Sequence, residues 1–294
     1  MSVIVTSSRP VELPDASLSI AARNMPPQEF ERMRAAAFSE ISYSHEGLEI
    51  RGYMAVPADS GPKPAIVINR GGTRRGELTP SSVAQYLGLF ASWGYVAVAS
   101  QYRGAGGSAG RDEWGDGDVR DSLALLEILR VMPDVDMDRL GLVGGSRGGM
   151  VALMMLRESS EFRAAVTFGA PTNFTNLPPA GRLHRLLQSY LNSADDYYGA
   201  ARLRSAALWA DELCKQTPLL VQHGTGDRKI DPAHAYDLGL ALQRSLHPYK
   251  LVVYDNADHI LAGRRRESNR DMRTWLDMYV RDKSPLPRTG PHGN

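Results

Sequence analysis

The sequence is poor in cysteine and has no long hydrophobic run. Cys214 is the single cysteine among 294 residues, which excludes an internal disulfide and a cysteine-based metal cluster. No segment approaches the roughly 18 consecutive apolar residues that a membrane-spanning helix needs. The N-terminal residues MSVIVTSSRP lack a basic segment followed by an apolar one, so we expect no signal peptide. These absences predict a cytoplasmic protein that does not bind a membrane.

An excess of charge of either sign is also lacking. Lys and Arg together number 34 and Asp and Glu 33, which gives a formal net charge of +1 at pH 7. Nucleic-acid-binding domains usually carry a clear positive excess, so we expect no nucleic-acid partner. The histidines and carboxylates show no metal-ligand spacing, and we expect neither a metal nor a cofactor. The oligomeric state is left open, with a homo-oligomer among the alternatives.

Short apolar segments recur along the chain and alternate with stretches of helical periodicity. Such segments are typical of strands buried between two layers of helices in a parallel sheet. Before them, alternation around Gly47 predicts a hairpin over residues 41–56. We therefore predict an α/β fold with a mostly parallel sheet of about eight strands flanked by helices. The expected parallel strands are Ala65–Ile68, Tyr95–Ala99, Leu140–Val143, Ala164–Phe168, Leu219–Gln222 and Leu251–Tyr254.

The rest of the chain is assigned around this core. Residues 1–38 are expected to form an N-terminal extension with a short helix over residues 28–37, and residues 39–282 the main domain. About fifty residues separate the strands at 164–168 and 219–222, and a connection of that length usually has a function. Its helical patterns predict a helical cap over residues 172–215. Residues 283–294 are expected to be a flexible tail.

The run LGLVGGSRGG, from Leu140 to Gly149, carries the clearest chemical signal. An apolar strand ends in glycines, Ser146 follows, and residues 150–156 have the character of a buried helix. This is a G-x-S-x-G nucleophile elbow in its required strand–turn–helix setting. Gly144 and Gly148 let the strand and the helix approach closely, so the serine is exposed on a strained turn. Ser146 is the candidate nucleophile.

A serine hydroxyl needs a base to take its proton and an acid to orient that base. In an α/β-hydrolase the acid and then the histidine follow the serine along the chain, each after a strand. Asp227 follows the strand at 219–222, and His259 follows the strand at 251–254. Both match that order, which predicts a catalytic triad on an α/β-hydrolase fold.

Other residues compete for these roles. Asp231 is an alternative acid, but its position before Pro232 predicts a helix N-cap. Asp258 is another, although direct adjacency to His259 rarely gives the needed side-chain geometry. His223 lies at the end of an inner strand and is interpreted as a buried histidine that fixes the loop before Asp227.

Acyl-transfer chemistry also needs donors for an oxyanion. The backbone amide of Arg147, directly after the nucleophile, is the first candidate. The second is expected in the loop after the strand at 65–68, where Gly71 and then Gly72 are the candidates. The alternative is that this glycine pair forms a tight turn without a catalytic amide.

Over about residues 62–281 the chain resembles the catalytic domain of the prolyl oligopeptidase family of serine peptidases. The similarity is carried by Arg70–Thr73, Tyr102–Gly104, Gly117–Asp121, the elbow at Gly144–Gly149 and the acid loop at His223–Asp227. The resemblance implies the triad Ser146, Asp227 and His259. Peptide-cleaving members usually carry a β-propeller or similar domain that filters substrates, and residues 1–38 are too few to build one.

The predicted activity is that of a serine hydrolase. It would cleave an ester or amide acyl bond of a small molecule or short peptide through a covalent acyl-enzyme. A carboxylesterase or dienelactone-type hydrolase is the alternative within the same class. An acyltransferase and a non-catalytic binding protein with the same fold are the alternatives from other classes.

Arginines near the predicted site suggest a substrate with an anionic group, because guanidinium groups bind carboxylates well. The alternative is that they are solvated and paired with Glu77, Asp112 or Glu113. Within the predicted cap, Tyr190 and Tyr197 are further candidates for substrate contact. The arginines concerned are Arg70, Arg74, Arg75 and Arg147.

Overall fold

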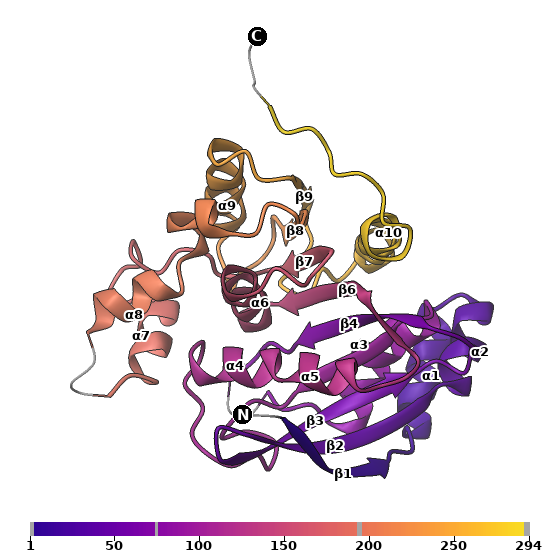
Figure 1. Ribbon diagram of the computed structural model, residues 1–294. Helices are drawn as coiled ribbons and strands as arrows, with labels where there is room; N and C mark the ends of the chain where they lie inside the picture. The colour runs from indigo at the N-terminus through magenta and orange to yellow at the C-terminus, as the bar shows by residue number, and fades with distance from the viewer. Residues whose placement is uncertain (1–2, 74–75, 193–195, 291–294) are drawn as a thin grey trace. The chain divides into compact units, whose positions relative to one another are not determined.

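The computed structural model describes residues 3–73, 76–192 and 196–290 (Figure 1). The chain divides into two compact units. The first comprises residues 1–112 and 117–141, and the second residues 113–116 and 142–294. The boundary falls inside one strand, β6 (Val135–Gly145), so both units contain part of it.

The first unit contains the N-terminal part of the sheet. Its strand order is β1-β2-β3-β5-β4-β6. The pairs β1–β2, β2–β3 and β3–β5 are antiparallel, whereas β4–β5 is parallel. Every residue of β4 and β5 is buried, as expected for strands covered on both faces. The bounds are β1 (Ile4–Pro10), β2 (Ala37–His45), β3 (Leu48–Val56), β4 (Lys63–Asn69) and β5 (Val96–Ser100).

Five helices lie among the described residues of the first unit, and three of them pack together. The helices α1 and α2 lie against α3 (Figure 1). The start of α3 is well capped, since Oγ of Ser82 accepts the Thr79 N–H at 2.7 Å and Pro80 occupies the first turn. The bounds are α1 (Asp15–Asn24), α2 (Pro27–Ala35), α3 (Pro80–Ser92), α4 (Gly117–Leu123) and α5 (Leu125–Arg130).

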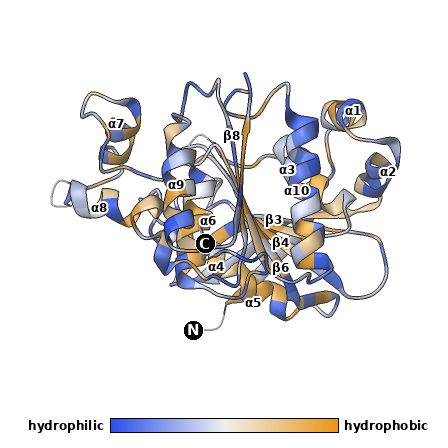
Figure 2. Cartoon of the chain, turned by 90° about the horizontal axis from the view of Figure 1, so that it is seen from above, coloured by the Kyte–Doolittle hydropathy of each residue, from blue (hydrophilic) through white to orange (hydrophobic). Residues whose placement is uncertain are grey.

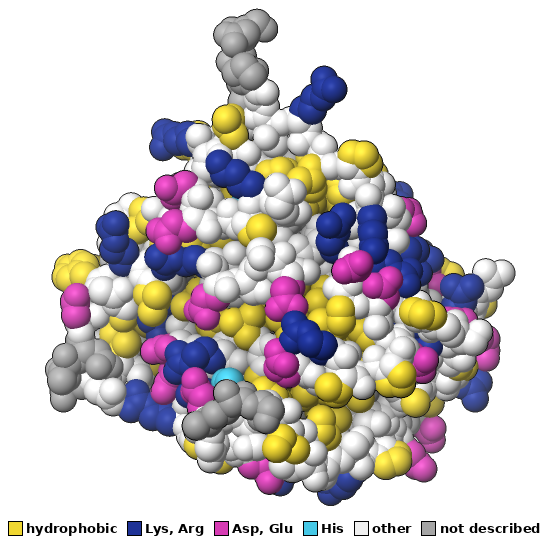
Figure 3. Space-filling model, viewed as in Figure 1, with side chains coloured by type: hydrophobic (Ala, Val, Ile, Leu, Met, Phe, Trp, Pro, Cys, Tyr) yellow, Lys and Arg dark blue, Asp and Glu magenta, His cyan; other side chains and the backbone are white. Residues whose placement is uncertain are grey.

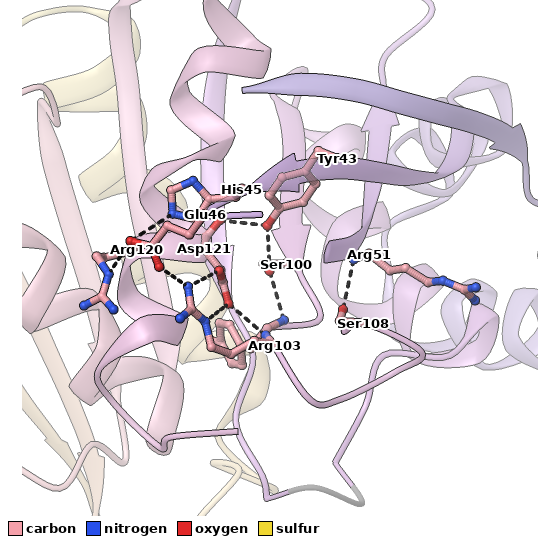
Figure 4. A network of polar contacts seen from close by, with 10 residues as sticks. Tyr43, His45, Glu46, Arg51, Ser100, Arg103, Ser108, Arg120 and Asp121 are labelled. Atoms are coloured by element: carbon pink, nitrogen blue, oxygen red, sulfur yellow. Dashed lines mark hydrogen bonds and ion pairs between the residues drawn. The ribbon is translucent and has the colours of Figure 1, made fainter. Parts of the chain in front are cut away.

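A buried polar network ties the hairpin of the first unit to α4 (Figure 4). The Asp121 carboxylate, whose side chain is fully buried, accepts the backbone N–H of Arg103 at 2.8 Å and two of its guanidinium donors at 3.0 and 2.8 Å. The hydroxyl of Tyr43 donates to the Asp121 carbonyl at 2.7 Å. Glu46, at the hairpin turn, accepts from Arg103 and Arg120, both at 2.8 Å. The network satisfies charges that burial would otherwise penalise.

The second unit continues the sheet in the order β6-β7-β8-β9, with β7–β8 and β8–β9 parallel. Helix α6 packs on β7, and α9 and α10 lie on opposite sides of β8 (Figures 1 and 2). The parallel strands therefore end in one row of loops, where an open α/β sheet builds its site. The bounds are β7 (Ala164–Phe168), β8 (Leu219–Gly224), β9 (Tyr249–Tyr254), α6 (Arg147–Glu158), α9 (Ala233–Arg244), α10 (Arg265–Leu276) and the π-helix η3 (Asp277–Arg281).

The described part of the insertion between β7 and β8 contains short helices joined by irregular segments. It contains α7 (Arg182–Gln188), α8 (Tyr197–Leu203) and the 3-10 turns η1 (Ala206–Leu208) and η2 (Ala210–Glu212). Its first residues are held to α9, because Nδ1 of His234 accepts the amides of Thr172 and Asn173, both at 3.2 Å. Its role as a cap stays a prediction, as do the domain boundaries expected from the sequence.

The main differences from the sequence predictions lie at the N-terminus. Residues 1–38 are not only an extension, since β1 pairs with β2 and α1 precedes the expected helix, which is α2. The six predicted strands and the hairpin are present, the predicted mostly parallel sheet is confirmed, and it has nine strands among the described residues. His234 and His247, for which the sequence gives no chemical context, are buried, at 7% and 1% exposed. The predicted tail has no helix or strand over residues 283–290, and its last four residues lie outside the described part.

Both basic and acidic side chains are scattered over the face shown in Figure 3. Apolar residues concentrate on inner strands such as β4, coloured as hydrophobic in Figure 2. Among the described residues, no helix has the length and apolar character needed to cross a membrane.

Candidate active site

The turn between β6 and α6 holds Ser146 in an uncommon backbone conformation. Its φ is 55° and its ψ is −126°, a backbone conformation that residues other than glycine rarely adopt. Its N–H donates to the carbonyl of Phe168 at 2.8 Å, which ties the turn to β7. The flanking positions must be small, since a Cβ on Gly145 would come within 2.2 Å of the Phe168 ring. These features match a nucleophile elbow.

Ser146, His259 and Asp227 form a continuous hydrogen-bonded chain in the second unit. Nε2 of His259 lies 2.9 Å from Oγ of Ser146, and Nδ1 lies 2.8 Å from Oδ2 of Asp227. An ionised carboxylate can only accept, so Nδ1 carries the proton and Nε2 accepts the serine O–H. The His259 side chain is 12% exposed and that of Asp227 is fully buried. This geometry lets Nε2 take the hydroxyl proton directly.

The loops that carry the acid and the histidine are joined by backbone contacts. The N–H of Gly226 donates to the carbonyl of Ala257 at 2.9 Å. A Cβ on Gly224 would meet the same carbonyl oxygen at 2.1 Å, so the close approach requires glycine there. Gly169, at the end of β7 with φ of +55°, lies against the ring of His259. Three neighbouring strand ends therefore fix the histidine.

The Asp227 carboxylate is held ionised by four donors. Burial alone would raise the pKa of Asp227. The hydrogen bonds from His223, His259 and the amides of Ile230 and Lys229 outweigh burial and hold that pKa well below its usual range. The two amides donate to Oδ1 at 3.0 and 2.8 Å. Asp227 is therefore suited to stabilise a positive charge on His259.

The alternatives for the acid have other contacts. Oδ1 of Asp231 accepts the N–H of Ala233, the first residue of α9, at 2.9 Å, although the N-cap is Pro232 and not Asp231 as predicted. Oδ1 of Asp258 accepts the N–H groups of Ile260 and Ala262, at 3.0 and 2.9 Å, in its own loop. His223 is fully buried and lies at the end of β8, as interpreted from the sequence.

The predicted oxyanion donors lie at the expected positions of the chain. Arg147 is the first residue of α6, and its side chain is 1% exposed. Gly71 and Gly72 belong to the first unit, directly after β4. Gly72 has a φ of +85°, and a Cβ there would meet the Cα of Gly76 at 2.9 Å. The catalytic roles of these amides stay predictions.

Of the predicted arginines, Arg70 and Arg147 are described, and both are buried rather than solvated. Arg70 is 3% exposed, and its guanidinium donates to the carbonyls of Gln101, Gly71 and Gly76. It also stacks on the Tyr102 ring, with 4.6 Å between the guanidinium carbon and the ring centroid. These contacts favour a structural role for Arg70 in its own loop. Arg74 and Arg75 lie outside the described residues.

The two insertion tyrosines lie in aromatic contacts. Tyr190 is 5% exposed and stacks on Trp114, with ring centroids 5.9 Å apart. Tyr197, at the start of α8, is half-buried and stacks on His184 at 4.1 Å. Their contact with substrate stays a prediction. Among the described residues, no group of three or more His, Cys, Asp or Glu side chains is arranged to hold a metal ion.

A topology of helices on both sides of a mixed, mostly parallel sheet, with a serine at a strand–helix elbow, defines an α/β hydrolase. A family model for the prolyl oligopeptidase family matches residues 81–283. The chain belongs to this family of serine peptidases and is a hydrolase. The resemblance expected from the sequence is thereby confirmed.

The related proteins match this chain over different fractions of their own length. The uncharacterized peptidase YtmA of Bacillus subtilis is 26% identical over 244 residues, which is 80% of this chain and 91% of YtmA. Several further curated relatives are longer, and the chain spans 39% of their length or less. A puromycin-hydrolyzing peptidase of Mycobacterium tuberculosis has a similar structure, with a TM-score of 0.70 and 21% identity. That match covers 81% of this chain and 38% of the mycobacterial one.

An esterase also shares the fold. Acetyl xylan esterase 1 of Thermoanaerobacterium matches with a TM-score of 0.66 and 17% identity, over 90% of this chain and 94% of the esterase. At these identities the solved structures show the fold alone.

Proposed function

We propose that the chain is a serine hydrolase that cleaves the acyl bond of a small peptide-like amide or ester through Ser146, His259 and Asp227. The observation that carries this proposal is the unbroken chain of hydrogen bonds, 2.9 and 2.8 Å long, from Ser146 through His259 to Asp227. Family membership supports a peptide substrate.

Each member of the triad has one task in this mechanism. Nε2 of His259 takes the proton of the Ser146 hydroxyl as the oxygen attacks the acyl carbon. Asp227 stabilises the imidazolium that forms, and the imidazolium then gives the proton to the leaving amine or alcohol. Water, activated by the same histidine, hydrolyses the acyl-serine. The backbone amide of Arg147 is proposed to donate to the oxyanion.

Esters of small molecules are the second candidate substrate class. The chain spans 94% of acetyl xylan esterase 1 with the same fold, which supports a carboxylesterase as an alternative. The triad is equally suited to both bonds, because both pass through an acyl-serine. An acyltransferase would differ only in the acceptor, an alcohol or amine in place of water.

A panel of p-nitrophenyl esters and aminoacyl-nitroanilides tests the proposal, together with a fluorophosphonate probe. We expect the probe to label wild type and not Ser146→Ala, and the variant to lose about 10⁴-fold or more of turnover while it remains folded. Undiminished turnover by Ser146→Ala would refute the nucleophile. The ratio of kcat/KM values for anilides and esters assigns the substrate class, and an added alcohol that yields a new ester would show acyl transfer.

A further inference from the structure

Nε2 of His223 lies 3.2 Å from Oδ2 of Asp227, the oxygen that His259 also contacts. We propose that His223 is a positioning residue, whose Nε2–H donates to the Asp227 oxygen that also accepts the N–H of His259. The inference rests on the triad proposed above and adds a fourth residue to it.

The contacts of His223 determine which nitrogen carries its proton. Nε2 lies 3.2 Å from Oδ2 of Asp227 and 3.1 Å from the carbonyl oxygen of Ile230. Both neighbours only accept hydrogen bonds, so Nε2 must carry a hydrogen. Nδ1 is buried and has no hydrogen-bond partner in the described part of the chain. A proton on Nδ1 would be buried without an acceptor, which favours the neutral Nε2–H tautomer.

His223 completes the set of donors around the carboxylate. Oδ1 of Asp227 accepts two backbone amides from its own loop, and Oδ2 accepts the two imidazoles. Rotation of the carboxylate would break bonds on both oxygens at once. The His223 ring cannot easily yield, because its side chain is fully buried at the end of β8. The acid is therefore held in the orientation that His259 needs.

Because His223 and His259 both donate to Oδ2 of Asp227, His223 also affects how strongly the carboxylate attracts a protonated His259. The hydrogen bond from His223 draws on the same negative charge that stabilises the His259 imidazolium. Without that donor, the carboxylate would attract the imidazolium more strongly, and the protonated, inactive form of the enzyme would persist to higher pH. A merely structural histidine would not have this effect on the pH profile.

Other titratable groups surround this cluster and remain unchanged in the test. His234 in α9 interacts electrostatically with both His223 and Asp227, and also with Asp231 and Asp237. Arg228 and Lys229 are exposed beside Asp227, and Asp258 is exposed beside His259.

Replacement of His223 by the two carboxamides makes a matched pair. The amide nitrogen of glutamine can occupy the place of Nε2, whereas that of asparagine falls about one bond short. With p-nitrophenyl acetate, we expect His223→Asn to lower kcat by about 10- to 100-fold. Its kcat/KM profile should lose activity in acid at a pH about 0.5 to 1 unit higher than in wild type. His223→Gln should stay within about threefold of wild type with an unchanged profile.

Several outcomes are distinguishable. If the fluorophosphonate labels wild type but not Ser146→Ala, while His223→Asn and His223→Gln share one rate and one profile, only the role of His223 is overturned. If wild type is not labelled, the triad fails and His223 loses its role with it. Should both variants unfold, ¹⁵N NMR of wild type with labelled histidine decides: Nε2 protonated supports the proposal, and Nδ1 protonated refutes it.

Discussion

The carbonyl oxygen of Gly148 lies 2.1 Å from the point where a Cβ on Gly144 would sit. Strand β6 and helix α6 approach this closely only because residue 144 is glycine. Gly144→Ala should therefore force the elbow apart and lower the free energy of unfolding by about 3 kcal/mol or more, as measured by urea denaturation.

Gly239→Ala in α9 is the matched control. The nearest atom to a Cβ there is the flexible Leu251 Cδ2, at 3.0 Å. We expect a change of about 1 kcal/mol at most, because alanine also favours the helix. Equal stability of the two variants would show that the close approach at the elbow is unimportant.

The conformation of Ser146 predicts a gain of stability from loss of the nucleophile. A φ of 55° with a ψ of −126° is strained for serine and for alanine but not for glycine. Ser146→Gly should therefore unfold at higher urea concentration than Ser146→Ala, by about 1 kcal/mol, although both lack activity. The reverse order would mean that the turn is not strained.

Loss of the buried Asp121 carboxylate in the first unit should lower the free energy of unfolding strongly, even when the new side chain has the same shape. Asp121→Asn removes the charge that pairs with the buried Arg103 guanidinium, and we expect a loss of about 3 kcal/mol in the free energy of unfolding. Glu46→Gln is the control, because Glu46 pairs with the same arginine but its side chain is 39% exposed. It should cost less than about 1 kcal/mol. If both variants lost a similar free energy of unfolding, burial of the carboxylate would not be what determines the strength of its pairing with Arg103.

His247 should make the fold sensitive to acid. Burial lowers the pKa of His247 from 6.5 to about 4, against the hydrogen bond to the Thr217 carbonyl, which raises it. Between these values the unfolded chain binds a proton that the folded chain does not. The folded state therefore loses stability as the pH falls from about 6.5 to about 4, by roughly 3 kcal/mol in total.

His247→Gln provides the test, since glutamine can donate to the Thr217 carbonyl but does not titrate. The difference in unfolding free energy between wild type and variant should shift in favour of the variant as the pH is lowered from 7 to 4. A constant difference across that interval would contradict the assignment.

The sequence predicted the elements that depend on local patterns. The buried strands are short apolar runs between turn residues, and the elbow and the order of Asp227 and His259 depend only on spacing along the chain. The strand β1 was missed because its residues are exposed throughout, so no alternation marks a buried face. The exposed β1 is a strand only because β2 pairs with it.

The contacts of the site were harder to predict. Arg70 was considered for an anionic substrate because guanidinium groups bind carboxylates, but its guanidinium donates to the carbonyls of Gly71 and Gly76 nearby and to that of Gln101, 31 positions later. His234 is likewise held by partners that no local pattern indicates, since the amides of Thr172 and Asn173 lie some sixty positions earlier. Side-chain partners of this kind are set by tertiary packing, which no local pattern contains.

The strand β1 also has a consequence for solubility. A sheet edge offers unpaired N–H and C=O groups to which another chain can add. Here the edge position is taken by a strand with a register irregularity between Val5 and Ser7, a charged Arg9 paired with Glu40, and a terminal proline. Each feature discourages further pairing. Removal of residues 1–10 would transfer the edge to β2, a longer and more regular strand, and we expect the shortened protein to aggregate.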